Sequence, residues 1–197
     1  GFFRIGIEYA HEDTFAMEAR IHRIHNPLMV HWDTASTAFD ASDWRYAFVS
    51  DFLCEEDFKA RYPKADAVSF DGGDDLGVNW TDDDDIRVAE YWLREEKKRK
   101  ILKLSNGNTI REDLFKDDVR FMAEINGVTV VKEREATYHE VTRRVMNGVE
   151  ILEEEKWCGS SIPICPVWGE EVFADGQRHF LSLIRQAKSA QEMFNYW

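Results

Sequence analysis

The sequence predicts an α+β fold, built of mixed antiparallel strands and hairpins with a few helices. Three observations predict it. Several stretches alternate apolar and polar residues with the period of two that is typical of half-buried strands. Asn147-Gly148 and Asp175-Gly176 are two-residue turn sequences of the kind that joins antiparallel strands. Strand and helix patterns do not alternate regularly, so a parallel sheet of βαβ units is not expected.

The N-terminal part is expected to be rich in β-structure. FFRIGIEY, residues 2–9, and FAMEARIHRI, residues 15–24, both place apolar side chains on one face and predict a hairpin. Pro27 ends or bends the second strand, LMVHWD continues extended, and WRYAFVSDFL is a further strand. CEEDFKARYP is expected to form a short helix with acidic residues in its first turn and Cys54 as a poor N-cap.

Residues 64–85, KADAVSFDGGDDLGVNWTDDDD, change the composition of the chain. They contain three glycines, eight aspartates and no apolar periodicity, which predicts an acidic linker or loop. The segment lacks the ligand spacing of a calcium-binding loop, because Gly73 and Leu76 stand where a loop starting at Asp71 needs an oxygen ligand and a glycine. It therefore divides the chain into residues 1–63 and 86–197.

The segment after this linker predicts more strands and a helix. IRVAEYWLREEKKRKILKL is interpreted as two strands joined at a charged tip near Glu95–Lys98. Thr109 and Glu112 have the spacing of a capping box ahead of EDLFKDDVRFMAEI, a helix that is expected to end at Asn126-Gly127.

The C-terminal third is expected to begin with a long strand and to end in a helix. VTVVKEREATYHEVTRRVM predicts the long strand, which turns at Asn147-Gly148 into VEILEEE. A proline-rich joint and a hairpin at Asp175-Gly176 follow, and Ser189 with Glu192 is expected to open the final helix. Because the chain starts in a strand-like stretch and stops in a helix-like one, we expect it to be a piece of a longer protein.

The composition narrows the classes of function. The chain of 197 residues is 44% hydrophobic and 13% aromatic, which is enough for a folded core. Its net charge of −13 disfavours nucleic-acid binding through an overall basic surface. Cys54, Cys158 and Cys165 show no CxxC spacing, so we expect reduced thiols in a cytosol-like compartment. No signal peptide and no apolar run of about 18 residues is present, so no membrane span is expected.

REEKKRK, residues 94–100, is the strongest basic cluster. It lies at the expected hairpin tip without interleaved aromatic residues, which favours a solvated tip or a protein-contact tip, with phosphate contact as the alternative. The candidate contact residues are Lys97, Lys98, Arg99 and Lys100.

The adjacent carboxylates Glu170 and Glu171 are a candidate pair for acid/base chemistry or for a nuclease metal site. Neighbouring residues of a strand point to opposite faces, so the pair cannot readily converge on one substrate atom. No nucleophile elbow, phosphate-binding loop or dinucleotide fingerprint occurs in the sequence. We therefore expect no catalytic, cofactor-binding or metal-binding residues, and interpret the segment as a stiff structural joint made by Pro163, Pro166, Trp168, Gly169, Glu170 and Glu171.

The same segment also indicates a family. IPICPVWGEEVFADGQRHF, followed by LIRQAKSAQEMFNYW, resembles the P22-like tailed-phage portal proteins. Further stretches agree with that family in the same order: RIHRIHNPLMVHWD, DWRYAFVSDFLCEEDFKARYP, IRVAEYWLRE and KLSNGNTI. The resemblance covers essentially the whole chain.

The resemblance implies a structural protein that is not an enzyme. In this family the full-length chain forms a dodecameric ring at a capsid vertex, DNA passes through its channel without sequence-specific binding, and terminase, head-to-tail adaptor, scaffold and capsid proteins contact it. It implies a virion location after assembly in the host cytoplasm. Residues 1–63 would be a wing-like β-rich segment, and residues 86–197 an α+β unit on the stem and clip side that returns to the wing.

Two other functions stay open at this stage. The acidic residues could serve a metal-dependent nuclease or phosphodiesterase, which loss of cleavage on Glu170→Gln would reveal. The chain could also be an adaptor or terminase-docking module that uses REEKKRK as its contact surface.

Overall fold

The computed structural model describes residues 1–65, 81–82 and 85–196. Antiparallel strands dominate them, accompanied by helices, which confirms the α+β class. The N-terminal elements are β1 (Phe2–Tyr9), β2 (Met17–Ile24), the 3-10 helix η1 (Pro27–Met29), β3 (Val30–Trp32), β4 (Tyr46–Cys54), α1 (Glu55–Arg61) and β5 (Thr81–Asp82). The later elements are β6 (Asp85–Leu104), β7 (Thr109–Arg111), the 3-10 helix η2 (Glu112–Leu114), α2 (Asp117–Ile125), β8 (Val130–Met146), β9 (Ile151–Trp157), β10 (Ile164–Pro166), β11 (Glu170–Ala174), β12 (Gln177–Leu181) and α3 (Leu183–Asn195).

The largest sheet has the order β3-β4-β6-β8-β9, with β5 and β7 also paired to β6. Its strands come from both sides of the acidic segment, because β4 pairs with β6. Most of that segment lies outside the described residues, and Thr81–Asp82 within it pairs with the start of β6. The smaller sheets are β10-β1-β2 and the hairpin β11-β12.

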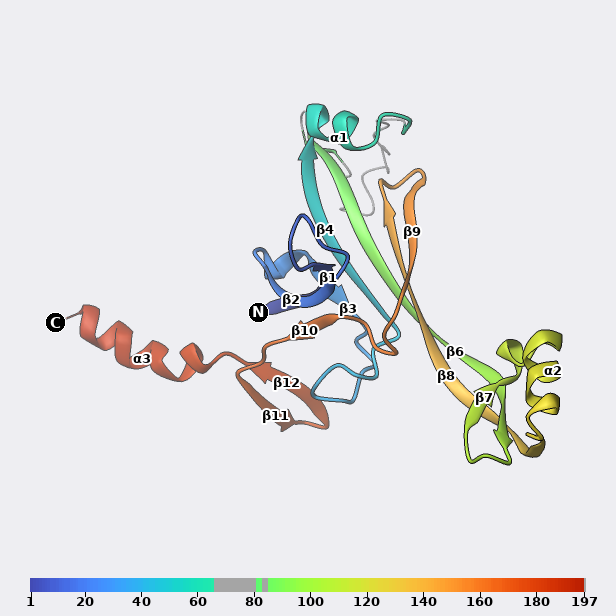
Figure 1. Ribbon diagram of the computed structural model, residues 1–197. Coiled ribbons are helices and arrows are strands. Elements are labelled where there is room, and N and C mark those ends of the chain that lie inside the picture. The colour runs from blue at the N-terminus through green and yellow to red at the C-terminus, as the bar shows by residue number, and fades with distance from the viewer. Residues whose placement is uncertain (66–80, 83–84, 197) are drawn as a thin grey trace.

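Strands β6 and β8 form a long twisted ribbon that extends beyond the other strands (Figure 1). Their pairing keeps one register from Ala89 opposite Met146 to Lys103 opposite Lys132, and a bulge follows at Lys103/Leu104. One end of the ribbon reaches α1, and the other carries β7 and α2 (Figure 1). Helix α3 projects away from the rest of the molecule (Figure 1).

The prediction of a hairpin tip near Glu95–Lys98 is wrong. Strand β6 runs without interruption from Asp85 to Leu104 and pairs with β8 throughout the charged stretch. The stretch contains no glycine, proline, asparagine or aspartate that would favour a turn. Both faces of this part of the ribbon are accessible to solvent, so charged side chains do not oppose strand formation there.

Two predicted helix starts are also wrong, while the predicted turns at Asn147-Gly148 and Asp175-Gly176 are confirmed. Thr109 belongs to β7, and α2 begins later, with Lys116 at its N-cap. Helix α3 begins at Leu183, where the Ser182 hydroxyl accepts a hydrogen bond from the Ile184 N–H, so Ser189 lies within the helix. The predicted end of α2 at Asn126-Gly127 is confirmed, with Gly127 at φ +67°.

Two clusters of buried residues form the core. The larger one gathers Trp44, Trp92 and Val141 with residues from β1, β3 and β10, and thus joins the N-terminal segment, the large sheet and the C-terminal third. The smaller one seats Phe58 of α1 against Ile86, Val88 and Val145. None of the described helices is long and apolar enough to cross a membrane.

Candidate functional site

The proline-containing segment that the sequence singled out pairs with the N-terminal strand β1. Strand β10 pairs antiparallel with β1, and the Ile5 N–H donates to the Pro163 carbonyl at 2.9 Å. The Val167 N–H donates to the Gly1 carbonyl at 2.7 Å. Pro166 lacks an N–H, which β10 accommodates because it is the edge strand of its sheet. These residues hold strands that are more than 150 residues apart in sequence.

Trp168 lies where this segment meets the larger core cluster. Its ring centroid is 5.7 Å from that of Phe2, 5.5 Å from that of Trp32 and 4.1 Å from that of Phe180. Its indole N–H donates to the Phe39 carbonyl at 3.2 Å. The ring therefore packs between the N-terminal segment and the β11-β12 hairpin, while the exposed Gly169 connects it to β11.

The carboxylate pair does not form a convergent acid/base site. Glu170 and Glu171 are successive residues of β11 and so point to opposite faces of the hairpin. The Glu171 carboxylate forms an ion pair with Arg178 of β12, and Arg178 also donates to the Ser36 carbonyl at 3.0 Å. Glu171 therefore helps to fasten the hairpin to the loop that precedes β4.

The four predicted contact residues lie along β6 and do not share one surface. Successive side chains of a strand alternate in direction, so Lys97 and Arg99 face one side of the ribbon and Lys98 and Lys100 face the other. The Lys97 ammonium lies 2.6 Å from a Glu140 carboxylate oxygen, and this hydrogen bond raises the pKa of Lys97 above its ordinary value. Lys97 is therefore already neutralised within the sheet.

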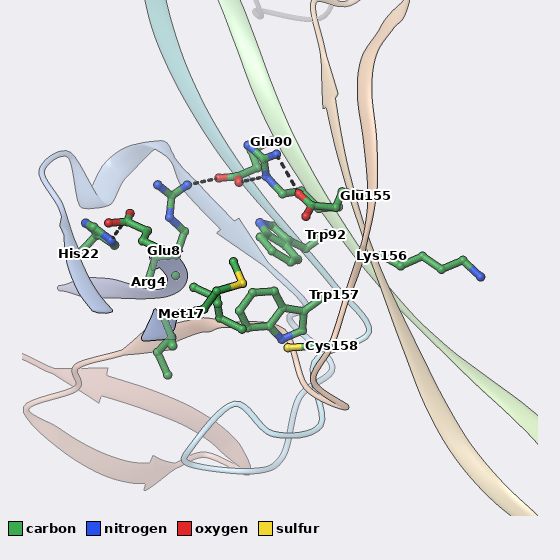
Figure 2. A pocket seen from close by; sticks show the side chains of 14 residues that line it. Arg4, Glu8, Met17, His22, Glu90, Trp92, Glu155, Lys156, Trp157 and Cys158 are labelled. Atoms are coloured by element: carbon green, nitrogen blue, oxygen red, sulfur yellow. Dashed lines mark hydrogen bonds and ion pairs between the residues drawn. The ribbon is translucent and has the colours of Figure 1, made fainter. Parts of the chain in front are cut away.

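A pocket that the sequence did not predict lies between β1, β2 and the middle of the large sheet (Figure 2). It has a volume of about 440 Å³. Apolar side chains of Ile5, Ile7, Met17, Trp92 and Trp157 form part of its wall, and charged residues complete it: Arg4, Glu8, His22, Glu90, Arg143, Glu155 and Lys156.

Glu90 is the centre of the charged part of this pocket. Glu90 is only 8% exposed. Its carboxylate accepts a hydrogen bond from Arg4 at 2.8 Å and another from Arg143 (Figure 2). Arg143 also donates to Glu153 at 3.1 Å. Burial acts to lower the pKa of Arg143, but the hydrogen bonds to Glu90 and Glu153 outweigh it and raise the pKa. The guanidinium therefore stays charged and the network stays intact at neutral pH.

Trp92 adds an unsatisfied donor to the same pocket. It is 3% exposed, and its indole N–H has no hydrogen-bond acceptor within the part of the chain that the structure describes. A buried N–H without an acceptor is costly, so this position favours an acceptor supplied from outside the described residues.

The chemistry of these groups is that of an interface more than that of a reaction centre. Glu90 and Arg143 are engaged with each other, and the Glu8 carboxylate of the same pocket lies 2.9 Å from His22 Nε2. Across the described ranges 1–65, 81–82 and 85–196, no group of three or more His, Cys, Asp or Glu side chains could hold a metal ion.

The sequence did not lead to Glu90 and Arg143, although a local sequence feature marks each of them. Glu90 is a single acidic residue within the apolar stretch IRVAEYW, and Arg143 lies in a strand where its neighbours Val141 and Val145 are buried. A charge at a core-facing position indicates a buried partner. The two residues are 53 positions apart, so only the pairing of β6 with β8 could identify that partner.

Comparisons with known proteins give one consistent result. A family model described as "Phage P22-like portal protein" matches residues 1–197. A curated relative named "Portal protein", from Acyrthosiphon pisum secondary endosymbiont phage 1, is 26% identical over 180 residues. The match covers 87% of this chain and 25% of the relative, so the chain spans about a quarter of the length of that protein.

Proposed function

The chain belongs to the P22-like phage portal protein family, and from this we propose that it forms part of the ring-shaped DNA channel at a capsid vertex. The observation that carries the proposal is the family match over residues 1–197. The role is structural: packaging and ejection of the genome through the ring, with no reaction catalysed by this chain. The partners are further copies of the chain in a dodecameric ring, terminase, head-to-tail adaptor, scaffold and capsid proteins, and DNA.

The exposed edge of β8 supports assembly with neighbouring subunits. Strand β9 pairs with β8 only from Val141 to Met146, so the same edge of β8 from Val130 to Glu140 has no strand partner among the described residues. A long unpaired edge offers backbone donors and acceptors to another chain. In a ring, the neighbouring subunit can supply the missing strand.

Exposed apolar side chains on α3 support the same proposal. Ile184 and Phe194 are 77% and 78% exposed, and Met193 and the C-cap residue Tyr196 are also exposed. An isolated helix of 13 residues is marginally stable in water, and its apolar face needs a partner. Helix α3 would find that partner elsewhere in the full-length subunit or in the next one.

The parts of the chain are assigned within this proposal as follows. Residues 1–63 are wing-like, 64–85 form an acidic linker, and 86–197 form the unit on the stem and clip side. The segment from Pro163 to Glu171 acts as the stiff joint between that unit and the N-terminal strands. Because β4 and β6 share a sheet across the linker, the two larger parts would move as one body.

Full-length protein is expected to form rings with a central channel. Electron microscopy of the purified full-length chain, with class averages of end-on views, measures both the ring and its rotational symmetry. The chain of 197 residues alone is the control, and it is expected to remain smaller than a ring. A full-length protein that stays monomeric in every assembly condition would refute the proposal.

A nuclease would cleave DNA in the presence of a divalent metal ion, whereas the proposed structural role predicts no cleavage. Incubation of duplex DNA with the chain and Mg²⁺ or Mn²⁺ is expected to give no cleavage above background. Glu170→Gln and Glu171→Gln are matched variants that each remove one charge from opposite faces of β11. Metal-dependent cleavage that is abolished by either substitution would replace the structural role by an enzymatic one.

A further inference from the structure

The register of the ribbon brings five basic residues onto one face. Directly paired residues of antiparallel strands share a face, and Lys103 lies opposite Lys132, while Ile101 lies between Arg134 of β8 and Arg111 of β7. Arg99 follows two residues before Ile101 on the same face. We name this surface the basic face; it consists of Arg99, Lys103, Arg111, Lys132 and Arg134.

The basic face is not neutralised by the rest of the described chain. Arg99, Lys103, Lys132 and Arg134 have no ion-pair partner among residues 1–65, 81–82 and 85–196. Arg111 has one, with its Nε 3.7 Å from exposed Asp113. Four of the five residues are exposed, and the fifth, Arg99, lies with its guanidinium carbon 4.4 Å from the centroid of the Tyr138 ring.

The opposite face of the ribbon has a different character. Glu133 and Glu135 of β8 alternate with the cations and point to this other side. Leu102 and Leu104, on the same side, are buried at the end of the ribbon, where α2 lies (Figure 1). The two faces therefore differ in net charge: Glu133 and Glu135 offset Lys98 and Lys100 on this side, whereas the basic face gathers cations from β6, β7 and β8.

The arrangement suits a phosphate backbone better than a protein surface. Lys103 and Lys132 are directly paired across strands, about 5 Å apart, and Lys132 and Arg134 lie about 7 Å apart along β8. Three of the five are arginines, whose guanidinium group can contact phosphate oxygens through two N–H donors. The face has few apolar anchors, which protein partners commonly use as the centre of an interface.

We propose that the basic face binds the phosphate backbone of duplex DNA without sequence preference. The inference deepens the proposed function, on which it rests for the source of that DNA, the genome in the channel. The net charge of −13 opposes binding elsewhere on the chain, so the basic face both attracts DNA and orients it.

The test compares two double substitutions on the same ribbon. Lys103→Gln with Arg134→Gln removes two exposed cations from the basic face, and Lys98→Gln with Lys100→Gln removes two from the opposite face. Both variants change the net charge equally, so long-range attraction is matched. The 197-residue chain is titrated against a short fluorescent duplex, and anisotropy gives the dissociation constant over a range of salt concentrations.

The expected difference is large at low ionic strength. Five phosphate contacts give a slope of log K against log salt of about −4.5, and loss of two contacts brings it to about −2.7. At about 0.1 M salt the basic-face variant is expected to bind at least roughly tenfold more weakly, and the opposite-face variant to change by less than about threefold. Unchanged thermal unfolding midpoints would exclude misfolding as the cause.

Other outcomes overturn the inference. They are absence of DNA binding by the unsubstituted chain, equal losses in the two variants, and a basic-face variant that loses self-association while keeping its DNA affinity. The last outcome would assign the face to an acidic surface of a second copy. Ring formation by the full-length chain is scored separately by microscopy, so a missing ring refutes the proposed function while the anisotropy measurement stands on its own.

Discussion

Arg143→Met is expected to lower the free energy of unfolding by about 3–5 kcal/mol, because it leaves the buried carboxylate of Glu90 with only one of its two arginine partners. The methionine can fill much of the space of the aliphatic stem, so the main loss is electrostatic. Urea denaturation followed by tryptophan fluorescence measures the effect, since Trp92 lines the same pocket.

Two further variants separate this loss from a general effect of removing an arginine. Arg144→Met changes the next residue of β8, whose ion pair with Glu154 is exposed, and is expected to cost at most about 1 kcal/mol. Adding Glu90→Met to Arg143→Met removes the stranded carboxylate and is expected to restore part of the stability. Equal losses of unfolding free energy in Arg143→Met and Arg144→Met would show that the Glu90 carboxylate does not depend on Arg143 for its burial.

Trp44→Ala is expected to destabilise the chain by about 3–5 kcal/mol. Trp44 is 1% exposed and its ring stacks on Trp32 with centroids 6.2 Å apart, in the core cluster that includes residues of β1, β4, β6, β8 and β10. Removal of the ring leaves a cavity where all these strands meet. For a domain of this size the thermal midpoint is expected to fall by roughly 10 °C.

Phe173→Ala is the matched control for Trp44→Ala. Phe173 is a large aromatic residue of β11 that is mostly exposed, so its removal is expected to change stability by less than about 1 kcal/mol. Trp44→Phe should fall between the two, because it keeps an aromatic ring of smaller volume. A thermal midpoint of Trp44→Ala that equals that of Phe173→Ala would mean that Trp44 does not tie the strands together.

Local patterns predicted three of the hairpins correctly. The pairs β1-β2, β8-β9 and β11-β12 combine apolar alternation or a two-residue turn with strands that are adjacent in sequence. The stretch near Glu95–Lys98 misled because apolar alternation disappears where both faces of a ribbon meet water, and a charged run then resembles a turn. The helix starts failed since Thr109 and Ser189 have capping spacings that pairing and an earlier cap, Ser182, override.

The candidate site was only partly accessible from the sequence. The proline segment and Trp168 stand out because prolines and tryptophans leave strong local signals. The partnership of Glu90 with Arg143, and the gathering of Arg134 with Arg111, depend on which residues of distant strands face each other. The local sequence does not reveal that register. The alternation of bases and acids in KERE, residues 132–135, does indicate a strand whose two faces differ in charge.

Because β6 and β8 keep a single register, the effect of an insertion or deletion in their ribbon depends on whether it contains an odd or an even number of residues. Deleting Thr137 alone would turn the side chains of residues 130–136 of β8 to the opposite face of the ribbon. Glu135 would then lie opposite Arg99. Deleting Ala136 and Thr137 together would shorten the ribbon and leave each remaining side chain on its present face. Length variation among relatives should therefore occur in steps of two residues at this position, because loss of a single codon would replace Lys132 and Arg134 on the basic face by Glu133 and Glu135.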